Sequence, residues 1–282
     1  MLMAAMGLST GSISQAAGSG AGRTRDEPEV KSVSVLVLDG SNSTVVFARK
    51  VDAAMPIASI TKLMTALVIL DGKQPLDELI EITKADRYVG KNAYSRIPFG
   101  AKLTRGDLLC LALMSSENRA AQALGRNYPG GLATFVRTMN LKARALGMTQ
   151  THFVDPAGLS SDNVASARDL TKLVIAAGKR STIREYSTCR QLAVRIGRKM
   201  MEFHNTNSLV SKPDWDITVQ KTGYIVEAGQ CLVMQVEIES KPVIIVLLNS
   251  YGKYTRVADA KRIRQWMADR PNVAVPRVAG KA

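Results

Sequence analysis

The chain has 282 residues, enough for one large domain or two small ones, and its hydrophobic content of 46% is ordinary for a globular protein. Its net charge of +14 comes from scattered lysines and arginines, without a long basic run or a known nucleic-acid-binding motif. We therefore expect no binding to nucleic acid. No apolar run is long enough for a transmembrane segment.

Residues 1–20 are rich in Ala, Gly, Ser and Met, which is typical of the end of an export signal. Ser14-Gln15-Ala16 has the small-x-small spacing of a signal-peptidase site, although no Lys or Arg precedes it. A disordered N-terminal segment is the alternative. We predict a truncated signal and linker over residues 1–30, one domain over 31–270 and a tail over 271–282.

The domain is predicted to begin with a β-hairpin and to continue as helices. Residues 31–38 and 44–47 are rich in strand formers and are separated by Asp39-Gly40-Ser41-Asn42, a hairpin signal. Apolar residues at helical spacing predict a helix over residues 59–70. Further helices are expected over residues 105–114, 119–127, 133–146 and 167–177, with Thr104 and Ser166 as the N-caps of the first and the last.

The pattern changes near Trp215. Residues 216–221, 231–239 and 243–248 read as three strands with tight links, and residues 257–268 as a closing helix. Strands at both ends of the domain with helices between them predict an α+β fold. In this fold an antiparallel sheet is assembled from the two termini and is covered by helices.

Cysteines and histidines do not form a metal-binding pattern. Cys110 and Cys231 lie in apolar runs and are interpreted as small core residues. With no C-x-x-C pair and no cluster of Cys with His, we expect no metal and no cofactor. At most one disulfide is possible, and whether any two of Cys110, Cys189 and Cys231 pair stays open. His152 and His204 are expected to have no catalytic role.

An S-x-x-K sequence at residues 59–62 supplies a candidate nucleophile and base. Lys62 follows Ser59 by three residues on the predicted helix, so the two side chains share a face. A serine needs a base to remove its proton, and burial together with a neighbouring charge, here Lys221, would keep the lysine neutral. The Ser59 N–H, in the first turn, can receive a developing oxyanion. A second S-x-x-K, at residues 250–253, follows a strand and contains Gly, so we set it aside.

Two sequences match a second polar motif, S-x-N. Ser116-Glu117-Asn118 lies between two predicted helices, on a short connection that can aim side chains inward. Ser161-Asp162-Asn163 matches S-D-N more literally, but it belongs to the stretch 155–163, which we interpret as a surface loop. We therefore assign Ser116 as a proton relay toward the leaving nitrogen. Asn118 would orient the base or the substrate amide.

A third motif, K-T-G at residues 221–223, ends a predicted strand. Lys221 and the Thr222 hydroxyl can hold a carboxylate. Gly223 permits close approach by a substrate lying along the strand edge. The N–H of Tyr224 is then placed as a second oxyanion donor.

In this order and spacing, the three motifs resemble the signature of the serine penicillin-recognising enzymes. The chain is similar to the low-molecular-weight penicillin-binding proteins, the serine D-alanyl-D-alanine peptidases of the bacterial wall, over about residues 31–270. Its likeness to their endopeptidase branch, the penicillin-binding protein 7 type, is carried by residues 115–121, 128–131, 153–160, 221–224 and 228–234.

The resemblance implies that Ser59 forms an acyl-enzyme and that Lys62 is its base. Lys221 and Thr222 would anchor the substrate carboxylate. Arg256 lies near the place where related carboxypeptidases carry a carboxylate-binding arginine. The implied substrate is the D-Ala-containing stem peptide of peptidoglycan, with β-lactam antibiotics as acylating inhibitors. The chain ends too soon for the second β-domain and anchor of the membrane-bound carboxypeptidases, so a soluble or loosely associated periplasmic enzyme is expected.

Cleavage of peptidoglycan cross-links is the predicted activity, and a D-alanyl-D-alanine carboxypeptidase is the alternative. A serine β-lactamase uses the same motifs, but its commonest class needs a Glu-activated water. The stretch 153–163 offers only Asp155 and Asp162. A non-enzymatic wall-binding module is disfavoured because Ser59 and Lys62 are both intact.

Overall fold

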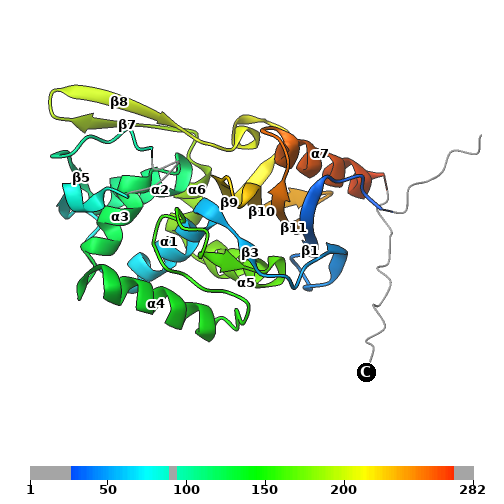
Figure 1. Cartoon of the computed structure of the whole chain (residues 1–282). Helices are drawn as coiled ribbons and strands as arrows, with labels where there is room; N and C mark the ends of the chain where they lie inside the picture. Colours follow the sequence, from blue (N-terminus) through cyan, green and yellow to red (C-terminus); the bar gives the residue numbers. More distant parts are fainter. Residues whose placement is uncertain (1–26, 89–93, 270–282) are drawn as a thin grey trace, which may run out of the picture.

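The computed structural model of the chain describes residues 27–88 and 94–269 (Figure 1). The predicted tail and most of the predicted signal and linker lie outside the described residues. Within the described ranges, no helix has the length and apolar character needed to cross a membrane.

A five-stranded antiparallel sheet is built from both ends of the described chain, in the order β2-β1-β11-β10-β9. In chain order its strands are β1 (Ser32–Asp39), β2 (Val45–Arg49), β9 (Asp216–Ile225), β10 (Gly229–Ile238) and β11 (Lys241–Ser250). The first strand pairs directly with the last, with Val35 opposite Leu247. The predicted α+β fold, with a sheet from both termini, is confirmed.

Both faces of the sheet are buried, which explains the nearly continuous apolar runs of β1 and β11. Successive side chains of a strand point to opposite faces. Leu36 and Ile244 therefore join one core cluster, while Val35 and Ile245 join another. Helix α5 (Ala167–Gly178) covers the first face, and α7 (Thr255–Ala268) covers the second.

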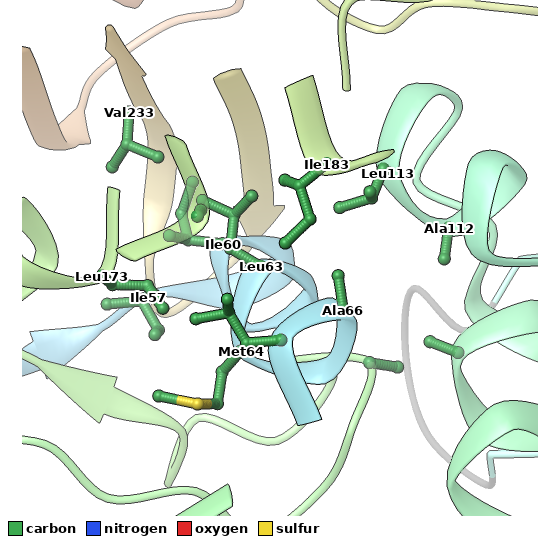
Figure 2. Close-up of a cluster of buried hydrophobic side chains, with 14 of the residues drawn as sticks. Ile57, Ile60, Leu63, Met64, Ala66, Ala112, Leu113, Leu173, Ile183 and Val233 are labelled. Atoms are coloured by element: carbon green, nitrogen blue, oxygen red, sulfur yellow. The ribbon is translucent and has the colours of Figure 1, made fainter. Parts of the chain in front are cut away.

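The remaining helices pack around α1 (Thr61–Asp71). They are α2 (Arg105–Met114), α3 (Asn118–Arg126), α4 (Gly131–Ala145) and α6 (Ser181–Thr188). Every residue of α1 from Thr61 to Ile69 is buried, as expected for a helix that is enclosed on all sides. Figure 2 shows side chains of α1 among Leu113 of α2, Leu173 of α5 and Val233 of β10. A 3-10 turn, η1 (Ala58–Ile60), leads into α1 and carries Ser59.

The predicted helices are found within a few residues of their expected bounds, and both predicted N-caps are confirmed. Thr104 Oγ1 accepts a hydrogen bond from Asp107 N at 3.0 Å. Ser166 Oγ accepts one from Asp169 N at 3.1 Å. In each case the side-chain oxygen satisfies an N–H that the first helical turn leaves without an internal partner.

Several smaller elements were not predicted. The largest are α6 and a two-stranded hairpin of β7 (Gln191–Ile196) and β8 (Lys199–His204), which projects from the molecule in Figure 1. Short pairs are formed by β3 (Met55–Pro56) with β6 (Val164–Ala165), and by β4 (Leu79–Glu81) with β5 (Lys102–Thr104). Two further 3-10 turns are η2 (Lys84–Asp86) and η3 (Ser208–Ser211).

Candidate active site

Ser59 lies at the N-terminal end of α1, where the 3-10 turn passes beside β9. Its side chain is buried, with Oγ 3.4 Å from the carbonyl oxygen of Ala157. The preceding residue, Ala58, has a φ of 48°, a left-handed conformation that is uncommon outside glycine. Such backbone strain is kept mainly where surrounding structure enforces it, and it gathers at functional sites.

Lys62 follows Ser59 after one helical turn, and its side chain is completely buried. Its Nζ lies 2.7 Å from Ser59 Oγ, 2.9 Å from Asn118 Oδ1 and 2.6 Å from Ala157 O. A neutral amine has two N–H donors and one lone pair. The two carbonyl oxygens, which can only accept, take both hydrogens. The lone pair of a neutral Lys62 is therefore left facing the Ser59 hydroxyl.

Burial lowers the pKa of Lys62 to about 7, against the opposing effect of the Asp155 and Glu117 carboxylates. We expected burial and the charge of Lys221 to lower this pKa together; burial is confirmed as a cause, and Lys221 is not among the causes. Desolvation is the main cause at Lys62. The pKa of Lys221 is itself lowered well below its ordinary value by burial, by Lys62 and by Arg256.

Ser116 connects α2 to α3 and faces the sheet. Its φ of 62° is again left-handed. Lys221 Nζ donates to Ser116 Oγ at 2.9 Å and to the carbonyl oxygen of Thr222 at 2.9 Å. The S-x-N and K-T-G motifs therefore meet across the boundary between the helices and the sheet.

The K-T-G residues lie inside β9, which continues to Ile225, so the predicted end of the strand at Lys221 is wrong. Gly223 pairs with Cys231 of β10, which extends the ladder past the motif. A Cβ on Gly223 would lie 2.8 Å from Ile57 O and 3.2 Å from Ser59 N. Only glycine lets the edge strand pass this close to Ser59.

Tyr224 follows Gly223 on β9, and Arg256 of α7 contacts the same part of this strand. Tyr224 is half exposed on β9. Arg256, in the first turn of α7, donates from one terminal nitrogen to Gly223 O at 2.8 Å, with Cys231 O at 3.4 Å. Burial lowers the pKa of Arg256. Its buried Nε has no hydrogen-bond partner among the described residues.

Residues 21–252 match the family peptidase S11, described as D-alanyl-D-alanine carboxypeptidase. The chain belongs to this family of serine DD-peptidases.

The D-alanyl-D-alanine endopeptidase of Pseudomonas aeruginosa is 46% identical over 255 residues, which cover 90% of this chain and 82% of that protein. The D-alanyl-D-alanine endopeptidase of Escherichia coli K12 is 44% identical over 261 residues, covering 92% of this chain and 84% of that protein. The crystal structure of the Streptomyces K15 DD-transpeptidase is similar with a TM-score of 0.78 and 30% identity, over 85% of this chain and 98% of that one.

In this DD-peptidase the stretch 155–163 forms a wall of the site. Its interpretation as a surface loop is wrong for residues 155–159 and for Asn163, which are buried. Asp155 Oδ1 accepts from the N–H groups of Ala157 at 2.7 Å and Gly158 at 2.6 Å. These bonds fold the loop so that Ala157 O reaches Lys62. Sequence reasoning missed this role, although an Asp followed by a Gly-containing turn is a signal for such side-chain-to-backbone bonds.

Glu117, the middle residue of S-x-N, is a second feature that sequence reasoning missed. Its buried carboxylate accepts from Arg96 N at 3.1 Å and from the Ser95 hydroxyl. Burial raises its pKa. The neighbouring Asn118 donates through Nδ2 to Tyr94 O at 3.0 Å. The motif thus fastens residues 94–96 beside the candidate nucleophile as well as orienting Lys62.

The serines and histidines that the sequence analysis did not assign to the active site have other surroundings. Ser250 is buried at the end of β11, with its Oγ 2.6 Å from Ser32 Oγ. Ser161 lies in a turn of the loop and is partly exposed. His204 is exposed at the end of β8, 3.7 Å from Glu202, and His152 is exposed beside β6.

Gly158→Ala is expected to lower the rate of acylation by a β-lactam by about 10²-fold, the effect of a small misplacement of a catalytic group. Gly158 has a φ of +76°, and a Cβ there would lie 1.9 Å from Ala58 O. The loop must then move, which withdraws Ala157 O from Lys62. Reaction with a fluorescent penicillin measures the rate.

Gly197→Ala is the matched control. Gly197 also has a positive φ, of +60°, but a Cβ there meets nothing within 4 Å. This variant carries the same kind of backbone strain without the clash and should acylate at close to the wild-type rate. Equal rates in the two variants would contradict the role given to the loop.

Proposed function

We propose that this serine DD-peptidase hydrolyses D-alanyl bonds of peptidoglycan stem peptides through an acyl-enzyme on Ser59, with cross-links as its preferred substrate. The observation that carries the proposal is the buried Lys62 amine, 2.7 Å from the Ser59 hydroxyl. The same chemistry makes β-lactam antibiotics acylating inhibitors. Because this substrate belongs to the cell wall, the proposed location is the periplasm.

The first step transfers an acyl group to Ser59. Neutral Lys62 takes the hydroxyl proton as the serine oxygen attacks the D-alanyl carbonyl carbon. The N–H groups of Ser59 and Tyr224 are the proposed donors to the oxyanion, because the start of η1 lies against β9 at this point. Asn118 holds the lysine in the orientation that the transfer requires.

The leaving amine must then gain a proton. Ser116 is proposed to pass one to the leaving nitrogen. Lys221 already donates to Ser116 Oγ, so it would stabilise this oxygen while it is deprotonated. The proton that Lys62 took from Ser59 then restores the Ser116 hydroxyl, so that both groups are neutral again. Water attacks the ester carbon, and Lys62 removes a proton from that water.

The substrate carboxylate is proposed to bind at the K-T-G strand. The buried Lys221 amine and the partly buried Arg256 guanidinium lie along β9, and a bound carboxylate would favour the charged form of Lys221. Thr222 Oγ1, 2.6 Å from Thr206 Oγ1, is part of a hydroxyl pair that can donate to an anion. Gly223 lets β9 pass close to η1, which keeps this anchor beside Ser59.

A cross-link and a free peptide terminus both present a D-alanyl carbonyl and a nearby carboxylate to the proposed binding site at Lys221 and Thr222. A cross-link has the same D-alanyl carbonyl, and its leaving group is the D-centre of a second stem, whose carboxylate lies next to the scissile amide. The anchor therefore serves both substrates. The preference for cross-links is supported by the two relatives at 44% and 46% identity, which are endopeptidases.

Acylation is expected to accelerate with pH through about 7. Lys62 acts as a base only when neutral, and its pKa is lowered to about 7, so the protonated, inactive form dominates below that pH. Rates with a fluorescent penicillin should rise about tenfold per pH unit at acidic pH and level off above about pH 8. Lys62→Arg, which stays charged, should be inactive throughout. A flat wild-type profile would contradict the assignment of the base.

Ser116→Ala should slow acylation by about 10²–10⁴-fold, the usual effect of losing a proton-transfer group. Ser161→Ala is the control, because this serine belongs to the competing S-D-N sequence and lies in a turn. It should react at close to the wild-type rate. The opposite ranking of the two variants would refute the relay.

The preferred reaction is tested by giving the purified protein cross-linked muropeptide dimers and free pentapeptide monomers in separate assays. We expect dimers to be converted to monomers faster than monomers release D-alanine. Release of D-alanine with dimers left intact would show a carboxypeptidase, while the Ser59 chemistry would still stand.

A further inference from the structure

Two of the three cysteines lie next to each other outside the candidate active site. Cys110 belongs to α2, and Cys189 directly follows α6. Both line one cavity of about 440 Å³, which Asp107 and Glu185 also border. The Cys189 thiol is near enough to Cys110 to contribute to raising the pKa of the Cys110 thiol. Cys231 lies apart in β10, fully buried, with its sulfur 3.4 Å from Ala228 O.

The two sulfurs differ in their exposure. Cys189 is partly exposed, and its thiol donates to Gln191 O at 3.1 Å. Cys110 is buried. Burial raises the pKa of the Cys110 thiol, and the Cys189, Asp107 and Glu185 side chains raise it further. Cys189 is therefore the sulfur that an incoming reagent meets first.

We propose that Cys110 and Cys189 form a disulfide when the protein meets a disulfide oxidant such as oxidised glutathione. The Cys189 thiolate attacks one sulfur of the oxidant, whose S–S bond breaks and releases one thiolate. Cys110 then loses its proton and attacks the Cys189 sulfur of the mixed disulfide, releasing the second thiolate. Two protein thiols are oxidised, and one small-molecule disulfide is reduced to two thiols.

The disulfide would join the two parts of the molecule that carry opposite walls of the candidate active site. Helix α2 leads from Cys110 to Ser116. On the other side, Asn205 Nδ2 donates to Cys189 O at 2.8 Å, and Asn205 Oδ1 accepts from Gln220 of β9 at 2.9 Å. The bond would join α2, which leads to Ser116, to the end of α6, which packs against β9 beside the boundary between the helices and the sheet. We therefore infer that it braces this boundary.

The bond also closes a loop of about 80 residues, and cross-linking a long loop stabilises a protein mainly by restricting its unfolded chain. The oxidised protein should accordingly melt about 5–10 °C above the reduced protein. Cys189→Ser, which replaces one sulfur by oxygen at a partly exposed position, should show no such shift on oxidation. Equal melting temperatures for the oxidised and reduced wild-type protein would contradict the proposed stabilisation by the disulfide.

Peptide mapping identifies which cysteines form the disulfide. The full chain is treated with oxidised glutathione, alkylated in denaturant and digested without reduction, and its peptides are identified by mass spectrometry. We expect one linked peptide pair containing Cys110 and Cys189, with Cys231 alkylated. Free thiols at both positions, glutathione retained on Cys189, or any link to Cys231 would overturn the proposal.

Discussion

The candidate active site depends on one constraint, the burial of the Lys62 side chain beside Ser59. Removing an amine from water is unfavourable unless its polar atoms find partners. Here the partners come from three different segments: η1 supplies Ser59 Oγ, α3 supplies Asn118 Oδ1 and the loop after α4 supplies Ala157 O. These hydrogen bonds offset the cost of burying the amine. The burial also lowers the pKa of Lys62 to about 7, where a lysine can serve as a base.

Holding these segments together requires local backbone that the chain would not adopt by itself. Ala58 and Ser116 are non-glycine residues with left-handed φ, and both border the site. Gly158 and Gly223 permit two close approaches of main chain to η1, one from the loop and one from β9. Such conflicts with local preference are expected where function, rather than stability, sets the structure.

Much of this fold could be predicted because its signals are local. Apolar runs identified β1 and β11, and side-chain caps located the starts of α2 and α5.

What could not be predicted depends on distant pairing. The strand β9 extends past Gly223 because β10 pairs with it. Ala157 O reaches Lys62 because Asp155 organises the loop, and a polar, Gly-containing stretch gives no sign of burial. The β7–β8 hairpin carries a local signal that sequence reasoning overlooked, because Leu192, Val194 and Ile196 alternate with more exposed residues along β7, the period of a half-buried strand.

Identification of the residue that a penicillin acylates tests the central claim most directly. The protein is labelled with a fluorescent penicillin, digested, and the labelled peptide is sequenced by tandem mass spectrometry. The account predicts a single adduct on Ser59 and no labelling of Ser59→Ala. An adduct on Ser250 or another serine, or undiminished labelling of Ser59→Ala, would contradict it.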